Sequence, residues 1–206
     1  MINIAVFISG RGSNFLALLK NIEKGVLKNC QISVVFSNNP NAKGLEYAEN
    51  AGIKTMVIPS KNRQDRENYD KEIIKALAPY NIDLICLAGY MRIVTSELVQ
   101  AYKNKIINIH PALLPSFPGL HAQKQALDYG VKVAGCTVHF VDEGMDTGAV
   151  ILQKTVPVYD NDTEKSLSER ILEQEHIAYT EAVALYAEGL LKIEGRKVII
   201  GKKVNE

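Results

Sequence analysis

The sequence predicts an α/β protein, a single domain built on an open, mostly parallel, twisted sheet with helices on both faces. Through the first 110 residues, short apolar runs rich in β-branched residues alternate with amphipathic stretches, as expected for repeated β-α-β units. The apolar runs lack polar alternation, which is typical of strands covered on both faces. The chain has 206 residues, which corresponds to about one domain.

The first half of the chain contains five predicted strands, which end at turn-forming residues such as Ser9-Gly10 and Pro59. The strands are expected at residues 2–8, 31–37, 54–58, 82–88 and 105–109. Apolar residues at helical spacing predict the intervening helices at residues 14–23, 44–50, 63–77 and 96–102. Four such crossovers predict a parallel sheet covered on both faces.

The pattern changes after residue 110. Residues 110–119 hold three of the seven prolines, so we expect an irregular, stiffened loop there. A terminal hairpin is expected at residues 190–204, turning at Glu194-Gly195. Between them we expect a helix at 123–129, strands at 134–141 and 150–159 around a polar loop at 142–148, and a long helix at 166–189 capped by Asp162-Thr163.

The composition excludes disordered proteins and fibrous repeat proteins. Hydrophobic residues make up 47% and charged residues 23%, an ordinary globular mixture. The net charge is +1, so the overall charge of the protein gives no reason to expect nucleic acid or an anionic membrane as a partner. No apolar run approaches the ~20 residues of a membrane span, and no cleavable leader is evident. We expect a cytoplasmic protein, a monomer or homodimer, whose partners are small molecules.

The cysteines and histidines lack the spacing of metal ligands. Cys30, Cys86 and Cys136 each lie in an apolar run without a C-x-x-C pair, and the four histidines are scattered. We therefore expect buried, reduced thiols and no metal site.

The first polar feature at a strand end is Gly10-Arg11-Gly12-Ser13-Asn14, between the first predicted strand and helix. Ligands of open parallel sheets bind beyond the carboxyl ends of the strands. The glycines allow a tight turn, and the helix start presents free N–H groups and the positive end of its dipole. Phe15 stands where a dinucleotide motif has its third glycine. We interpret the segment as a binding site for a monophosphate. The alternative is that it is an ordinary tight turn between a strand and a helix, without a ligand.

Three further polar features follow strands, at residues 89–94, 108–111 and 142–146. Strand alternation places Asn108 and His110 on one side, where an amide and an imidazole suit oxyanion stabilisation and proton transfer. A lone histidine is more often structural, and His121, His139 and His176 are interpreted in that way. A carboxylate of the acidic loop near His110 would favour the imidazolium form.

Several motifs occur in one order along the chain: residues 10–14, Ala88-Gly89-Tyr90-Met91-Arg92, Asn108-Ile109-His110-Pro111 with Leu113-Leu114-Pro115, and the Asp146 loop. In this combination the chain resembles the phosphoribosylglycinamide formyltransferases over essentially its whole length. The Asn-x-His-Pro and Leu-Leu-Pro elements are shared among 10-formyltetrahydrofolate enzymes, whereas the Gly-x-Gly-Ser-Asn turn points to the glycinamide enzymes. The resemblance implies a Rossmann-like formyltransferase domain over residues 1–206. A phosphate-binding half would end near residue 105, and a catalytic and folate-binding half would begin near residue 106.

The resemblance also implies a reaction and a set of site residues. The formyl group would pass directly from 10-formyltetrahydrofolate, a co-substrate, to the amine of 5-phosphoribosylglycinamide in purine biosynthesis, without a metal. The implied catalytic residues are Asn108, His110 and Asp146. The ribonucleotide would contact Gly12, Ser13, Asn14, Leu172, Glu173, Gln174 and Glu175. The folate would contact Arg66, Met91, Arg92, Ile93, Val94, Asn108, Asp142, Glu143, Gly144, Met145 and Asp146.

Three alternatives stay open. A methionyl-tRNA formyltransferase would need an additional RNA-binding domain and a basic surface, which the single domain and the net charge of +1 argue against. A 10-formyltetrahydrofolate hydrolase would use water as the nucleophile and would not need a phosphate cradle. A non-catalytic nucleotide-binding module is compatible with the fold class but would not require Asn108, His110 and Asp146 together.

Overall fold

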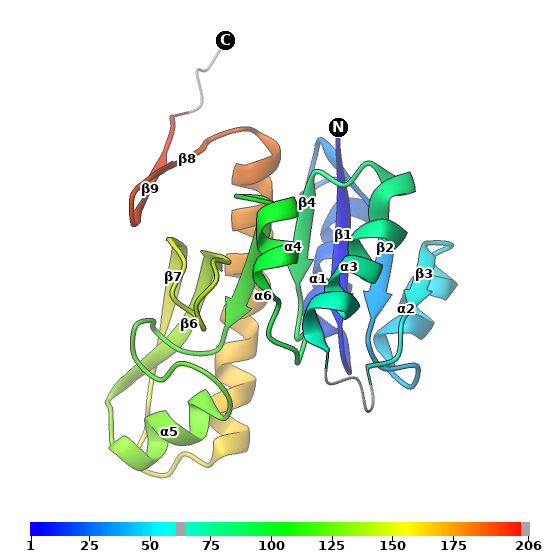
Figure 1. Ribbon diagram of the computed structural model, residues 1–206. Helices are drawn as coiled ribbons and strands as arrows, with labels where there is room; N and C mark the ends of the chain where they lie inside the picture. Colours follow the sequence, from blue (N-terminus) through cyan, green and yellow to red (C-terminus); the bar gives the residue numbers. More distant parts are fainter. Residues whose placement is uncertain (61–64, 203–206) are drawn as a thin grey trace.

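The computed structural model describes residues 1–60 and 65–202, which form one nine-stranded sheet with helices on both sides (Figure 1). The strand order is β3-β2-β1-β4-β5-β6-β7-β9-β8. The predicted fold class is confirmed, because the first five strands pair in parallel. These strands are β1 (Ile2–Ile8), β2 (Cys30–Ser37), β3 (Lys54–Val57), β4 (Leu84–Leu87) and β5 (Ile106–His110).

Each crossover between these strands contains a helix, as the alternating pattern predicts. The four helices are α1 (Ser13–Glu23), α2 (Gly44–Asn50), α3 (Arg66–Leu77) and α4 (Ser96–Ala101), and a short 3-10 turn at Ala78–Tyr80 follows α3. The carboxyl ends of the parallel strands lie at one edge of the sheet, toward the bottom of Figure 1, where β1 leads into α1.

The second half of the chain adds antiparallel strands to the parallel sheet. After α5 (Ala122–Tyr129), β6 (Val133–Phe140) pairs antiparallel with β5, and β7 (Val150–Pro157) pairs antiparallel with β6. The long helix α6 (Glu164–Ala187) then crosses behind the sheet (Figure 1). The hairpin of β8 (Leu191–Glu194) and β9 (Lys197–Ile200) joins the sheet where Lys197 pairs with Val150 of β7.

The two faces of the sheet bury separate apolar cores. One core contains side chains of α1, α2 and α6, such as Phe15, Leu45 and Tyr179. The other contains side chains of α3 and α4, such as Ile73 and Leu98. Because strand side chains alternate between faces, each central strand contributes to both cores. The continuous apolar runs in the sequence are explained by this double burial.

Several element ends differ from the predicted ones for local reasons. The strand predicted to reach Tyr159 ends at Pro157, because the Tyr159 N–H donates to the Asp162 carboxylate (2.7 Å) in the turn before α6. The predicted cap at Thr163 is confirmed and forms a capping box with Ser166, so α6 begins at Glu164, two residues earlier than predicted. The predicted start of α3 at Arg63 and the predicted end of the hairpin at Val204 lie outside the described residues.

The three thiols are free and buried, as predicted. Burial raises the pKa of Cys30 and of Cys86 above the ordinary thiol value, and raises that of Cys136 to about 12. None of the helices within residues 1–60 and 65–202 combines the length and apolar character needed to cross a membrane.

Candidate active site

The turn after β1 is built around a glycine in the left-handed region. Gly12 precedes α1 with φ 72°, and a Cβ atom there would lie 2.8 Å from the Cα of Gly44. Only glycine fits both the conformation and the close approach. No side chain caps the start of α1 among the described residues, and its first turn holds no acidic residue. The first N–H groups of α1 therefore have no capping side chain among the described residues, at the positive end of the helix dipole.

A cavity of about 620 Å³ opens beside this turn. Residues 9–14 form one wall, and Ala88, Gly89 and Met91 continue it. A second wall is a face of α6 with Lys165, Ser168, Glu169, Leu172 and Glu175. Leu172 and Glu175 therefore line the same cavity as residues 10–14, called here the phosphate turn after their predicted role. Glu173 and Gln174 lie on other faces of α6 and do not line this cavity.

A buried hydrogen bond joins the two walls of the cavity. The Asn14 Nδ2 atom donates to Glu175 Oε2 at 2.7 Å, and both side chains are buried. Burial raises the pKa of Glu175, while the Asn14 hydrogen bond and the charge of Arg11 oppose the shift. Among the described residues, the Asn14 Oδ1 atom has no hydrogen-bond partner, so this wall offers a buried acceptor to a ligand donor.

The cavity extends to the chain neighbours of His110, since Ile109 and Pro111 both line it. His110 is buried with only 6% of its side chain exposed, and its Nδ1 atom lies 3.5 Å from Asp146 Oδ2. The same carboxylate oxygen accepts from the Gly119 N–H at 2.8 Å. On the other side of the ring, His110 Nε2 lies 2.9 Å from the Phe117 carbonyl oxygen. Both oxygens facing the ring are acceptors, so this arrangement suits an imidazolium, which donates from both nitrogens.

The alternation predicted for β5 holds in the structure. Ile107 and Ile109 pack in the core shared with α6, and Asn108 and His110 therefore share the opposite side of the strand. The structure thus places Asn108, His110 and Asp146 in one region at the carboxyl end of β5.

His139 also belongs to this group, although the sequence pattern suggested a structural residue. It lies opposite Asn108 in the β5–β6 register, and its Nε2 atom is 3.2 Å from Asn108 Nδ2. Its Nε2 atom is also 3.7 Å from Asp146 Oδ1. The register of β6 against β5 would have identified His139, but no sequence signal specifies that register.

The hydrogen bonds of His139 fix its tautomer. Its Nδ1 atom lies 2.8 Å from the Phe140 carbonyl oxygen, which only accepts, so Nδ1 carries a proton. Burial lowers the pKa of His139 and favours the neutral ring. The Nε2 atom of a neutral ring then accepts from the Asn108 amide. One N–H of Asn108 is held by His139, and the other is available to a reacting group.

The segment Met91–Val94, called here the folate segment after its predicted role, follows β4. Met91 lines the cavity and is 68% exposed as a residue, and Val94 is buried in the core of α3 and α4. The Arg92 guanidinium lies over the Tyr69 ring at 4.4 Å. Arg66 is exposed in the first turn of α3. The remaining member, Ile93, is half exposed.

The predicted acidic loop is organised by Asp142. Its Oδ1 atom accepts from the Gly144 N–H at 3.1 Å and from the Thr147 hydroxyl at 2.6 Å. Glu143 and Met145 are exposed, and Asp146 has φ 54°, a left-handed conformation. The loop therefore turns the Asp146 carboxylate back toward His110 and His139, while Asp142 maintains the turn.

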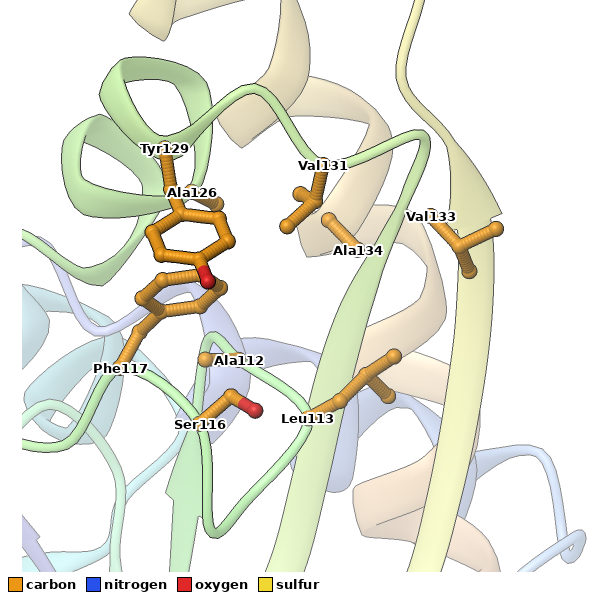
Figure 2. Close-up of a pocket in the computed structure, with 9 residues that line it drawn as sticks. All are labelled: Ala112, Leu113, Ser116, Phe117, Ala126, Tyr129, Val131, Val133 and Ala134. Carbon is orange, nitrogen blue, oxygen red and sulfur yellow. The ribbon is translucent and has the colours of Figure 1, made fainter.

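A second pocket, of about 340 Å³, lies behind the loop that follows His110 (Figure 2). Figure 2 shows Phe117 and Tyr129 at one end of the pocket, where their rings meet edge to face with centroids 5.8 Å apart, and Leu113 and Val131 on the other sides. The lining is almost entirely apolar and includes none of the predicted site residues. Phe117 is shared by the two places, because its carbonyl oxygen faces His110 Nε2 while the residue also lines this pocket.

Comparison with known proteins identifies the family to which the chain belongs. The sequence profile of the formyl transferase family matches residues 2–183. Since the match covers most of the sequence, the chain belongs to the formyl transferase family.

Individual members of the family and solved structures are similar to this chain over nearly its whole length. A phosphoribosylglycinamide formyltransferase of Escherichia coli (strain K12) is 42% identical over 93% of this chain and 90% of its own. The crystal structure of glycinamide ribonucleotide transformylase 1 from Symbiobacterium toebii superposes with a TM-score of 0.95 at 48% identity, covering 98% of this chain and 95% of that one.

The trifunctional purine biosynthetic protein adenosine-3 of Drosophila melanogaster is 47% identical over 90% of this chain, which spans only 14% of that relative's length. A formyltetrahydrofolate deformylase from Pseudomonas syringae shares the fold, with a TM-score of 0.91 at 26% identity over 98% of this chain and 66% of its own.

Proposed function

We propose that the protein transfers the formyl group of 10-formyltetrahydrofolate to the primary amine of 5-phosphoribosylglycinamide, a step of purine biosynthesis. The products are formylglycinamide ribonucleotide and tetrahydrofolate. The observation that carries the proposal is an anion-binding helix start on a cavity that reaches Ile109 and Pro111, the chain neighbours of His110, beside the group formed by Asn108, His110 and Asp146. The names of the relatives with 42–48% identity point to the same reaction.

The phosphate of the ribonucleotide binds at the start of α1. Gly12, Ser13 and Asn14 present N–H groups there, and the helix dipole favours a dianion. The ribose lies toward α6, where the Glu175 carboxyl and the Asn14 Oδ1 atom, unpartnered among the described residues, accept hydrogen bonds from its hydroxyl groups. In this proposal the substrate spans the cavity from the turn after β1 to the carboxyl end of β5, so the first half of the chain serves phosphate binding and the second half catalysis.

The folate binds against the folate segment and the 142–146 loop, on the other side of His110. Exposed Met91, Ile93 and Met145 supply apolar surface for its ring system. Arg66 and Arg92 supply positive charge, which suits a ligand that carries carboxylates.

The reaction begins when the neutral amine attacks the formyl carbon and a C–N bond forms. The carbonyl oxygen becomes an oxyanion, which the free N–H of Asn108 and the protonated His110 stabilise, at about 3–4 kcal/mol per donor. The Asp146 carboxylate, 3.5 Å from His110 Nδ1, orients the ring toward the reacting groups. A proton then moves from the amine to N10 of the folate, which leaves as its bond to the formyl carbon breaks. No covalent intermediate with the protein is required, and the proposal includes no metal.

The hydrolase is the second candidate, because the deformylase shares the fold with a TM-score of 0.91. Its nucleophile is water, and it has no need for the open helix start beside the cavity. The phosphate turn therefore favours the transferase.

A spectrophotometric folate assay tests the proposal. Purified protein is mixed with 10-formyltetrahydrofolate, or its dideaza analogue, with and without 5-phosphoribosylglycinamide. We expect deformylation only in the presence of the ribonucleotide. Deformylation without it would establish the hydrolase, and no deformylation in either mixture would leave a non-catalytic binding module.

A further inference from the structure

Helix α3, which packs behind the folate segment, carries a buried carboxylate that has no role in the proposed reaction. Asp70 of α3 is only 2% exposed. Its Oδ2 atom accepts two hydrogen bonds from Thr95, one from the backbone N–H at 2.7 Å and one from the hydroxyl at 2.9 Å. Thr95 directly follows the folate segment and precedes α4. A charged group is rarely buried unless its hydrogen bonds are specific.

The same turn of α3 contacts the segment a second time. The neighbour of Asp70, Tyr69, carries the Arg92 guanidinium over its ring at 4.4 Å, and its hydroxyl donates to the Ile58 carbonyl oxygen. Burial raises the pKa of Asp70, while the Thr95 donors and the charges of Arg92 and Arg66 act in the opposite direction. The charges of both arginines of the predicted folate site therefore act on the Asp70 carboxyl.

The other end of the folate segment is held by the turn after β1. The Met91 N–H donates to the Ser9 hydroxyl oxygen at 2.8 Å, and that hydroxyl donates to Asn38 Oδ1 at 2.5 Å. The segment is thus attached at both ends, to Ser9 before it and to Asp70 after it. Between these attachments, the side chains of Met91 and Ile93 remain exposed.

We propose that Asp70 is a positioning residue for folate binding, because its buried carboxylate holds Thr95 and thereby sets the conformation of the folate segment. This inference rests on the proposed function, which places folate against that segment. Removal of the acceptor would leave the Thr95 N–H and hydroxyl unsatisfied. The segment would then sample other conformations, and folate would bind more weakly at an otherwise intact catalytic group.

The test compares Asp70→Leu, which fills the space without an acceptor, with Asp70→Asn, which retains one. Steady-state kinetics give a KM for each substrate, and hydrogen exchange reports the Thr95 amide independently of activity. We expect Asp70→Leu to raise the KM for 10-formyltetrahydrofolate about tenfold and to speed Thr95 exchange. The KM for the ribonucleotide and kcat should stay within about twofold, and Asp70→Asn should recover most of the folate affinity.

Control variants separate positioning from stability. Lys71→Gln removes an exposed ion pair to Glu97 (3.2 Å) between α3 and α4 and should leave both KM values unchanged. If Asp70→Leu does not fold, Thr95→Val replaces it, because this variant removes one donor and keeps the shape. We expect it to raise the folate KM about threefold.

The outcomes are distinguishable. An unchanged folate KM in a folded Asp70→Leu protein, or in Thr95→Val, would overturn the positioning role while wild-type turnover upheld the proposed function. Equal rises in both KM values would also overturn it, since they would indicate a general structural role. A wild-type protein without folate turnover would overturn both proposals.

Discussion

The two halves of the sheet place polar groups in the site by different means. In the parallel half, the turn after β1 contributes mainly backbone N–H groups, and glycine conformation shapes it. At the junction of β5 and β6, the contributing groups are the side chains of paired strands, Asn108, His110 and His139. A turn is specified by local sequence, whereas a pair of strand side chains is specified by long-range register. The parallel half is therefore suited to holding a substrate, and the β5–β6 junction to chemistry.

The strongest test of this division is His110→Ala. We expect turnover to fall about a thousandfold or more, because the variant lacks both a proton-transfer group and an oxyanion donor. The KM for the ribonucleotide should change little, since the phosphate turn is untouched. Steady-state kinetics and circular dichroism check both statements.

His121→Asn is a matched control, because asparagine tolerates the φ of 58° found there. It should retain turnover within about twofold. Wild-type turnover in a folded His110→Ala protein would contradict the assignment of catalysis to β5.

A smaller loss is expected for His139→Ala. This variant removes the acceptor that orients the Asn108 amide, so kcat should fall about tenfold. His139→Gln should recover part of the rate, because a glutamine oxygen can accept from Asn108. Stopped-flow measurement of single turnovers separates this effect from product release. Failure of glutamine to improve on alanine would indicate that His139 acts as a proton donor and not as an acceptor.

The parallel half is tested by Gly12→Ala. The left-handed φ of 72° and the close approach to Gly44 both oppose a Cβ atom. We expect a cost of about 1–2 kcal/mol from the conformation alone, a Tm lower by roughly 2–8 °C, and a KM for the ribonucleotide raised about tenfold. The KM for folate should not change.

Gly52→Ala is the control for strain, because Gly52 has a φ of 69° and no atom of the described residues lies within 4 Å of an added Cβ. It should lower Tm without changing either KM. If Gly12→Ala impaired folate binding as strongly as ribonucleotide binding, the proposed division between the two regions would fail.

The smallest expected effect concerns stability and pH at Glu175. Burial raises the pKa of its carboxyl in the folded protein above the unfolded value. Between these two pKa values the folded state binds more protons than the unfolded state, so stability falls as pH rises. Glu175→Gln carries no charge and should lack this fall. Its Tm relative to wild type should therefore increase from pH 4 to pH 8, as calorimetry can measure. A difference in Tm that stays constant with pH would contradict the prediction.

Much of the fold follows from patterns within single elements. Continuous apolar runs separated by amphipathic stretches identify β1 to β5 and their helices to within a few residues, because double burial of a parallel strand demands such runs. The Thr163 cap is likewise local, since its hydrogen bonds reach only Ser166. Strand ends are less predictable. Tyr159 fits a strand by propensity but is drawn into a turn by Asp162.

The candidate site is predictable in part, for the same reason. Gly12 and the Asn108–His110 alternation are local features, and the structure has both. The position of His139 in the site could not be predicted from the sequence, because it depends on which residue of β5 lies opposite His139. Glu173 and Gln174 illustrate another limit: a run of consecutive helical residues cannot all face one cavity, and only Leu172 and Glu175 of the four do.

The three buried cysteines have a practical consequence. Thiolates are the reactive form, and raised pKa values and burial together leave these thiols almost inert to maleimides and iodoacetamide at neutral pH. A single cysteine placed at exposed position 91 would be the dominant labelling site without removal of any native thiol. A fluorophore attached there would report ligand-induced changes next to the cavity in real time.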